Sequence, residues 1–141
     1  DIETGLVKFL KYAIVHDCGV EINPRIVEGQ VVGGTAQGVG GTLLEELIYD
    51  ENGQLLTTSF MDYLIPTATD IPNFEVCHLQ TAAPQIPGGF KGMCEGGCVY
   101  TYAAVVNAVA DALEPLGVEI TSTPLSPSHL LKLLREARVS Q

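Results

Sequence analysis

The chain has 141 residues, of which 46% are hydrophobic and 17% are charged, so it is long and apolar enough to form one domain with its own core. Seventeen acidic residues against seven basic ones give a formal net charge of −10, and this field repels nucleic-acid phosphates and anionic lipid headgroups. The sequence contains no run of about 20 apolar residues, so it predicts no membrane-spanning helix. Four cysteines without a secretory leader favour reduced thiols in the cytoplasm.

The first half of the chain predicts a strand followed by a long helix. Residues 6–15 are rich in β-branched and aromatic side chains, which favours a strand. Asn23 and Pro24 suit a helix N-cap and the first helical position, so we expect a helix from Pro24 to about Leu47. Each glycine inside that helix costs about 1 kcal/mol relative to alanine. A compensating contact is therefore expected along the glycines of this segment, which are Gly29, Gly33, Gly34, Gly38, Gly40 and Gly41.

The second half predicts shorter elements. Asn52-Gly53 is typical of a hairpin tip, with 55–60 as the return strand, and the alternation in 74–81 predicts a further strand. Residues 84–97 hold two prolines and five glycines and favour an irregular loop. Helices are expected at about 97–113 and from Pro127 onward. The predicted fold is α+β, an antiparallel hairpin sheet packed by helices, in one domain spanning 1–141.

The glycine run at 29–41 does not match a phosphate-binding loop. It lacks the Lys-Ser/Thr that ends a Walker A loop, and it lies within a helical pattern instead of following a strand directly. Two interpretations remain open: close packing against another helix, or backbone contact with a large cofactor. Gln37 distinguishes them, because an amide within a cofactor-facing strip can both donate and accept hydrogen bonds.

The segment Pro87–Gly97 places Lys91 and Glu95 in a backbone with little side-chain bulk. A lone glutamate in such a loop is commonly a solvated residue. Because a helix is expected to begin just after Glu95, the free N–H groups there also allow a poised carboxylate at the mouth of a pocket. Both interpretations of Glu95 stay open at this point.

Cys94 also precedes the expected helix start, where a thiolate is favoured, so it is a candidate nucleophile. Such a role needs a base, and the three histidines, His16, His78 and His129, all lie far from it in sequence. Cys94 and Cys98 alone form a weak zinc signal. A cysteine-dependent enzyme is therefore a minor alternative.

Four segments together resemble a known family. They are 17–24 (DCGVEINP), 29–38 (GQVVGGTAQG), 62–67 (DYLIPT) and 89–96 (GFKGMCEG), and their order and spacing match from about Val7 to Ala137. The sequence is similar to the C-terminal part of the molybdenum-binding large subunit of the xanthine dehydrogenase, aldehyde oxidase and carbon monoxide dehydrogenase family.

This resemblance implies an oxidoreductase that hydroxylates an aldehyde, an N-heterocycle or a related substrate with oxygen from water. The implied cofactor is molybdenum on molybdopterin, expected in a dinucleotide form, and no residue of this chain is expected to ligate the metal. Glu95 matches the family's catalytic base, and Gln37 matches a glutamine against the cofactor. Other residues expected on the cofactor side are Gly34, Gly38, Lys91, Gly92, Cys94 and Gly96. Cys94 departs from the family, which commonly has glycine there.

The resemblance also implies partners. We expect the remaining segments of a molybdenum subunit, and iron–sulfur and flavin subunits that carry the clusters and FAD, together with a small-molecule substrate. The chain is then a fragment, inactive by itself, and its low charged fraction predicts that it self-associates when isolated. A non-catalytic assembly module of such a complex is the main alternative.

Overall fold

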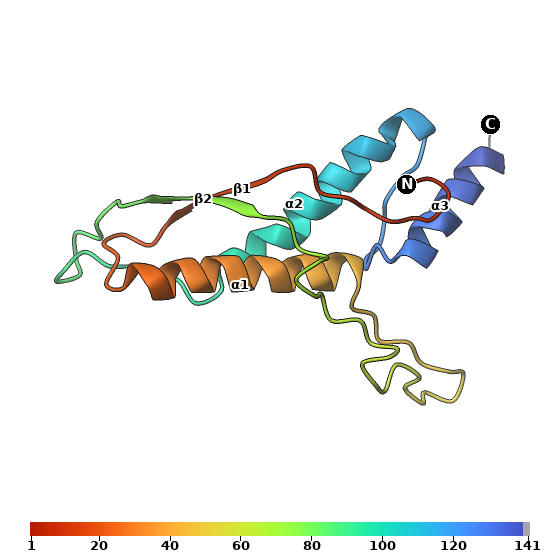
Figure 1. The fold of residues 1–141 in the computed structure, drawn as a ribbon, viewed down its shortest axis with the longest axis horizontal. Helices are drawn as coiled ribbons and strands as arrows, with labels where there is room; N and C mark the ends of the chain where they lie inside the picture. Colours follow the sequence, from red (N-terminus) through yellow and green to blue (C-terminus); the bar gives the residue numbers. More distant parts are fainter. Residues whose placement is uncertain (140–141) are drawn as a thin grey trace.

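The computed structural model describes residues 1–139. Its elements are the strand β1 (Tyr12–Asp17), the helix α1 (Pro24–Leu43), the strand β2 (Phe74–Leu79), the helix α2 (Gly96–Leu113), a 3-10 turn at Glu114–Leu116 and the helix α3 (Pro127–Val139). In Figure 1, the two-stranded ribbon lies along α1, α2 leads away from it at an angle, and α3 stands near the N-terminus. Within these residues, no helix is long and apolar enough to cross a membrane.

Helix α1 begins where the sequence predicts. The Asn23 side chain accepts a hydrogen bond from the Ile26 backbone N–H at 3.3 Å, and Pro24 occupies the first turn, where a missing N–H leaves no bond unmade. The helix ends at Leu43, four residues before the predicted end at Leu47. The cap therefore fixes where the helix starts, and after Leu43 the chain leaves the helix for a long irregular segment.

The predicted antiparallel sheet is wrong, because β1 and β2 pair in parallel. Tyr12 lies opposite Phe74 and His16 lies opposite His78. The reason is that α1 carries the chain back to the start of β1, so β2 enters the ribbon in the same direction. The predicted hairpin turn does form, with Tyr49 and Leu55 joined by an antiparallel bridge, but 55–60 forms no strand. This turn belongs to the excursion 44–73, which projects from the body of the molecule (Figure 1).

The glycines of α1 allow α2 to approach closely. A Cβ on Gly34 would lie 3.0 Å from the Cys98 backbone nitrogen, and one on Gly38 would lie 2.6 Å from Thr101 Cβ. The Thr101 hydroxyl is fully buried at this contact and donates to the Gly97 carbonyl at 2.7 Å. Contact with α2 therefore supplies the compensation that the glycine-rich helix requires.

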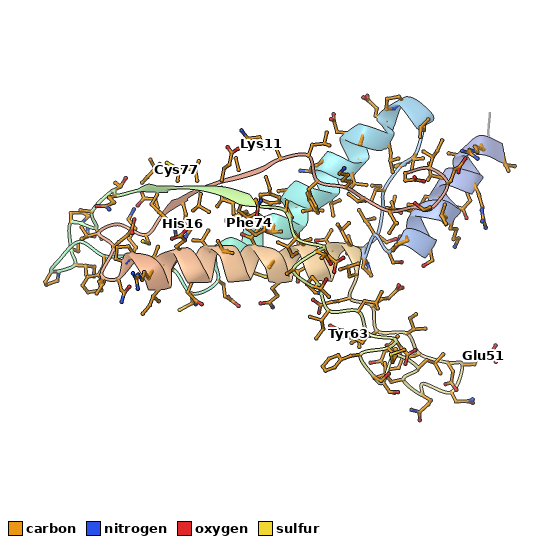
Figure 2. The ribbon with its side chains drawn as sticks, in the orientation of Figure 1. Lys11, His16, Glu51, Tyr63, Phe74 and Cys77 are labelled. Atoms are coloured by element: carbon orange, nitrogen blue, oxygen red, sulfur yellow. The ribbon has the colours of Figure 1, made fainter. Side chains whose placement is uncertain are left out.

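The core lies where the helices meet. The ribbon adds its inner face, and Figure 2 shows His16 and Phe74 on the side that faces α1, with Lys11 and Cys77 on the opposite side. The four cysteines are free thiols. The core cluster consists of Val39, Leu43, Val105, Val109, Leu125 and Leu130.

The packing contact predicts opposite effects at two glycines of α1. Gly38→Ala should lower the free energy of unfolding by about 1–3 kcal/mol, because the new methyl group collides with Thr101. Gly33→Ala should raise it by about 0.5–1 kcal/mol, because nothing lies within 4 Å of the new Cβ and alanine favours helix. Urea unfolding of both variants measures this, and equal effects would contradict the packing role of Gly38.

Candidate functional site

The loop that carries the candidate site is joined to the end of β1 by backbone contacts. The Lys91 N–H donates to the Cys18 carbonyl at 2.7 Å, and the Val20 N–H donates to the Gly89 carbonyl at 3.1 Å. Gly19 and Gly89 have φ angles of +71° and +72°, and a Cβ on Gly19 would overlap the Gly89 carbonyl oxygen. Only glycine suits both the conformation and the close approach. The loop therefore has a fixed attachment.

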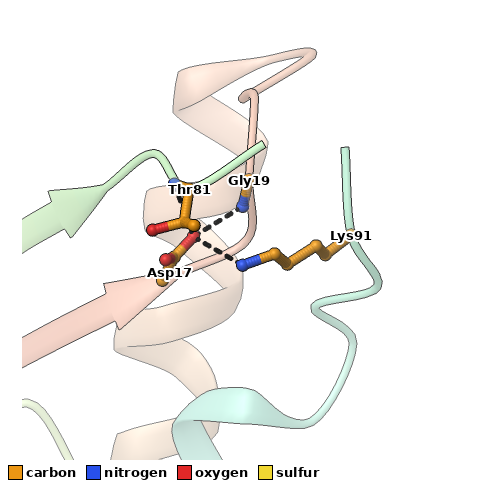
Figure 3. Close-up of polar contacts among 4 residues, drawn as sticks. All are labelled: Asp17, Gly19, Thr81 and Lys91. Carbon is orange, nitrogen blue, oxygen red and sulfur yellow. Dashed lines mark hydrogen bonds and ion pairs between the residues drawn. The ribbon is translucent and has the colours of Figure 1, made fainter. Parts of the chain in front are cut away.

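Asp17, the last residue of β1, gathers three donors on one carboxylate oxygen (Figure 3). Oδ1 accepts from the Gly19 N–H at 2.8 Å, the Thr81 N–H at 3.1 Å and the Lys91 ammonium at 3.2 Å. Hydrogen bonds from Thr81, then from Gly19 and Lys91, hold the pKa of Asp17 well below its ordinary value. This carboxylate is therefore ionised at any pH near neutrality.

Glu95 stands at the N-cap position of α2, and its exposed side chain makes no capping hydrogen bond. The two residues that follow it are fixed by close contacts. A Cβ on Gly96 would overlap Nε2 of His16, and one on Gly97 would overlap the Val31 carbonyl oxygen. The start of α2 is thus held by the ribbon and by α1, while the Glu95 carboxylate stays open to solvent.

One flank of α1 lies beside this loop. Gln30 donates its amide to the Cys94 carbonyl at 3.4 Å. At 100° per residue, Gln30, Gly33 and Gln37 share one side of the helix, and Gln37 lies about 10 Å further along the axis. Gln37 is exposed, and nothing lies within 4 Å of a Cβ on Gly33 or Gly92. We call this set, together with Cys94 and Glu95, the open surface.

The structure divides the predicted site residues into two groups. Lys91, Gly92, Cys94 and Glu95 are exposed on the loop and Gln37 is exposed on α1, whereas Gly96 lies against His16. Gly34 and Gly38 face α2, so that helix covers them. For these two glycines the structure provides a packing role, and contact with a cofactor stays a prediction.

Sequence reasoning did not single out Asp17 or Gln30 as site-forming residues, and it considered His16 only as a distant candidate base for Cys94. Gln30 precedes Gln37 by seven residues, or two helical turns, and this periodicity is the signal that was available. The Asp17–Lys91 contact joins residues 74 positions apart and has no local signal.

The open surface suits a flat organic group with hydrogen-bonding edges. Gly33 and Gly92 leave backbone accessible, Gln37 offers an amide, and the first N–H groups of α2 favour negative charge. Within residues 1–139, no group of three His, Cys, Asp or Glu side chains is placed to hold a metal ion directly. The Gln37 amide and the N–H groups at the start of α2 are donors of the kind that a polar organic cofactor with anionic groups needs.

Comparison with known proteins gives consistent matches. Residues 1–72 match the family described as molybdopterin cofactor-binding domain. The chain is 48% identical over 132 residues to the nicotine 6-hydroxylase large subunit of Paenarthrobacter nicotinovorans, covering 94% of this chain and 16% of that one. It is 35% identical over 136 residues to the carbon monoxide dehydrogenase large chain of Hydrogenophaga pseudoflava, covering 96% and 17%.

Solved structures agree with these matches. The quinoline 2-oxidoreductase of Pseudomonas putida 86 superposes with a TM-score of 0.85 and 52% identity, over 88% of this chain and 16% of that one. The Cu,Mo-CO dehydrogenase superposes with a TM-score of 0.93 and 35% identity, over 100% and 18%. The chain thus spans less than a fifth of the length of each relative that it matches.

The lowered pKa of Asp17 predicts a pH-dependent effect of Asp17→Asn. A carboxylate with a depressed folded pKa stabilises the fold above its unfolded value of about 3.9, and this contribution is lost as pH falls toward the folded value. The variant should therefore melt at a lower temperature than the parent at pH 7, and the gap should narrow below about pH 4. Thermal unfolding across pH measures it.

Asp111→Asn is the matched control, since Asp111 lies on an exposed position of α2. Its melting temperature should follow the parent at every pH. A constant gap for Asp17→Asn from pH 7 to pH 2 would contradict the assigned role of the carboxylate.

Proposed function

The chain belongs to the molybdopterin cofactor-binding domain family, and from this we propose that it supplies the catalytic base Glu95 and part of the cofactor wall of a molybdenum hydroxylase. The observation that carries this proposal is the Glu95 carboxylate, which is exposed and uncapped at the junction of the glycine loop, α2 and the flank of α1. The family itself consists of molybdenum-cofactor oxidoreductases, as its description and the relatives whose names include molybdenum indicate.

Residues of the open surface would hold the cofactor. The Gln37 amide would hydrogen-bond its polar edge, and backbone N–H groups around Gly92, Cys94 and Gly96 would approach its anionic parts. Gly34 and Gly38 support this wall indirectly, because they let α2 lie close to α1. When bound, the cofactor supplies a redox metal that takes two electrons from the substrate. The dinucleotide form remains part of the proposal.

Glu95 would accept the proton released when a water-derived oxygen attacks the substrate carbon. An uncapped carboxylate at a fixed helix start meets the geometric requirement for a general base, because its position is set and its oxygens are free. His16 and Val31 lie against Gly96 and Gly97, the two residues that follow Glu95, so the backbone from which the carboxylate extends has a defined position.

We propose an aromatic N-heterocycle as the substrate class. Nicotine 6-hydroxylase and quinoline 2-oxidoreductase, whose names contain such substrates, share 48% and 52% identity with this chain. The carbon monoxide dehydrogenases share 35–40%, and a xanthine dehydrogenase subunit shares 38%. Iron–sulfur and flavin subunits as partners, and a location in the cytoplasm, belong to the same proposal.

Glu95→Gln in the complete enzyme should leave molybdenum bound and lower turnover by at least about 10²-fold, because the amide retains the shape but does not accept the proton. Molybdenum content and steady-state rate are measured on one preparation. Glu51→Gln, in the exposed turn of the excursion, is the matched control and should turn over normally. Full turnover of Glu95→Gln at full metal content would remove Glu95 from the mechanism.

The assembly alternative rests on the excursion 44–73. Eight large apolar side chains there are 44–86% exposed: Leu47, Ile48, Tyr49, Leu56, Phe60, Met61, Leu64 and Ile65. Apolar surface on this scale marks a contact with another protein segment. It is compatible with the proposed function, because a cofactor wall also needs the rest of its subunit.

The isolated chain should therefore self-associate and bind a hydrophobic dye. Replacing Phe60 and Met61, which are 79% and 86% exposed, by serine should reduce both effects without unfolding the chain. Sedimentation velocity across a range of concentrations measures association. A monomer that binds no dye would show that this surface does not drive contact.

One observation supports the alternative of a cysteine-dependent enzyme, and one counts against it. His16 lies against Gly96, two residues from Cys94, so a histidine is nearer than the sequence indicates. No hydrogen bond joins the two side chains, and Cys94 is exposed on the loop. Loss of turnover in Cys94→Ala equal to that in Glu95→Gln would favour this alternative.

A further inference from the structure

We propose that Asp17 and Lys91 form a brace that positions the Glu95 loop, so that Lys91 acts on the protein and not on a bound ligand. This inference rests on the proposed function of Glu95, and it assigns Lys91 a different role from the cofactor contact that the sequence predicts. Asp17 and Lys91 are positioning residues in this scheme.

The contacts at Asp17 join three segments that are distant in sequence. Oδ1 receives the Gly19 N–H, the Thr81 N–H and the Lys91 ammonium, which belong to the turn after β1, the segment after β2 and the glycine loop. The end of the parallel ribbon and the loop thus meet on one oxygen (Figure 3). Losing the charge there would leave the backbone bonds as the attachment of the loop and remove the side-chain contact that restrains Lys91.

Lys91 is bound at both ends. Its backbone N–H donates to the Cys18 carbonyl at 2.7 Å, and its ammonium reaches Asp17, the residue before Cys18. The backbone and the side chain of Lys91 therefore bind two adjacent residues, Cys18 and Asp17, and this restrains the loop four residues before Glu95. The ammonium contact thus adds a charged side-chain restraint to the backbone hydrogen bonds that Gly89 and Lys91 make with the segment after β1.

A second ion pair in the same ribbon provides a contrast. Lys11, the residue before β1, pairs with Glu75 of β2 at 2.8 Å, but the two side chains are 66% and 64% exposed. The Asp17 side chain is 25% exposed and the Lys91 side chain is 36% exposed. The Asp17 carboxylate also accepts two backbone N–H hydrogen bonds, from Gly19 and Thr81. An exposed isolated pair contributes little, whereas a partly shielded pair within a network restrains its surroundings more strongly.

A double-mutant cycle tests the brace. Asp17→Asn keeps an oxygen acceptor for the Gly19 and Thr81 N–H groups but removes the charge, and Lys91→Met removes the ammonium while keeping the chain length. In the cofactor-free chain, each variant should raise hydrogen exchange at the 89–95 amides by on the order of tenfold. The double variant should exchange no faster than either single variant, because both remove the same contact.

In the complete enzyme, each variant should keep its molybdenum and lower kcat by about 10–100-fold, as expected for a base that is present but misplaced. KM should change by less than about threefold, and the double variant should match the single variants. Lys11→Met, which breaks the exposed pair in the same ribbon, is the matched control and should change neither exchange at 89–95 nor kcat.

Additive losses in the double variant, or a Lys91→Met variant that loses molybdenum while Asp17→Asn keeps it, would show that Lys91 contacts the ligand and would overturn the brace. Unchanged exchange in both single variants would also overturn it. Normal turnover in Glu95→Gln counts against the proposed function alone, since the exchange measurement does not depend on Glu95.

Discussion

Close approach of α1 and α2 is the contact on which the rest of the molecule depends. Gly34 and Gly38 remove the side chains that would separate the helices, and Gly97 does the same from α2. A larger residue at these positions would move the start of α2 and, with it, Glu95. The glycines therefore influence the site through helix placement, even though α2 covers two of them. Packing in an interior leaves little room for compensation, so small changes there are transmitted to the surface.

The candidate site is built from two restraints that meet at the glycine loop. One holds the start of α2, where Gly96 lies against His16 of β1 and Gly97 lies against Val31 of α1. The other comes from the end of β1, where Asp17 and the backbone of Cys18 hold Lys91. Between these two attachments the chain has only three residues before Glu95. Because this segment is short and both of its ends are held, Glu95 has a defined position although its side chain is exposed.

The open surface and the excursion expose different kinds of chemical groups. The open surface offers amides, accessible backbone and one carboxylate, whereas the excursion offers large apolar side chains. The first suits a polar cofactor and the second suits protein contact. Both uses are consistent with a chain that spans 14–17% of the curated relatives that it matches.

The sequence by itself determined the elements that have local causes. Asn23-Pro24 predicted the start of α1, the alternation at 74–81 predicted a strand that forms as β2 over 74–79, and four motifs in order identified the family. Tertiary structure alone decided the parallel pairing of β1 and β2, the burial of Gly34 and Gly38 under α2, and the Asp17–Lys91 contact. The physical reason is distance along the chain: caps and alternation act within a few residues, whereas a crossover or a 74-residue contact depends on where the whole chain goes.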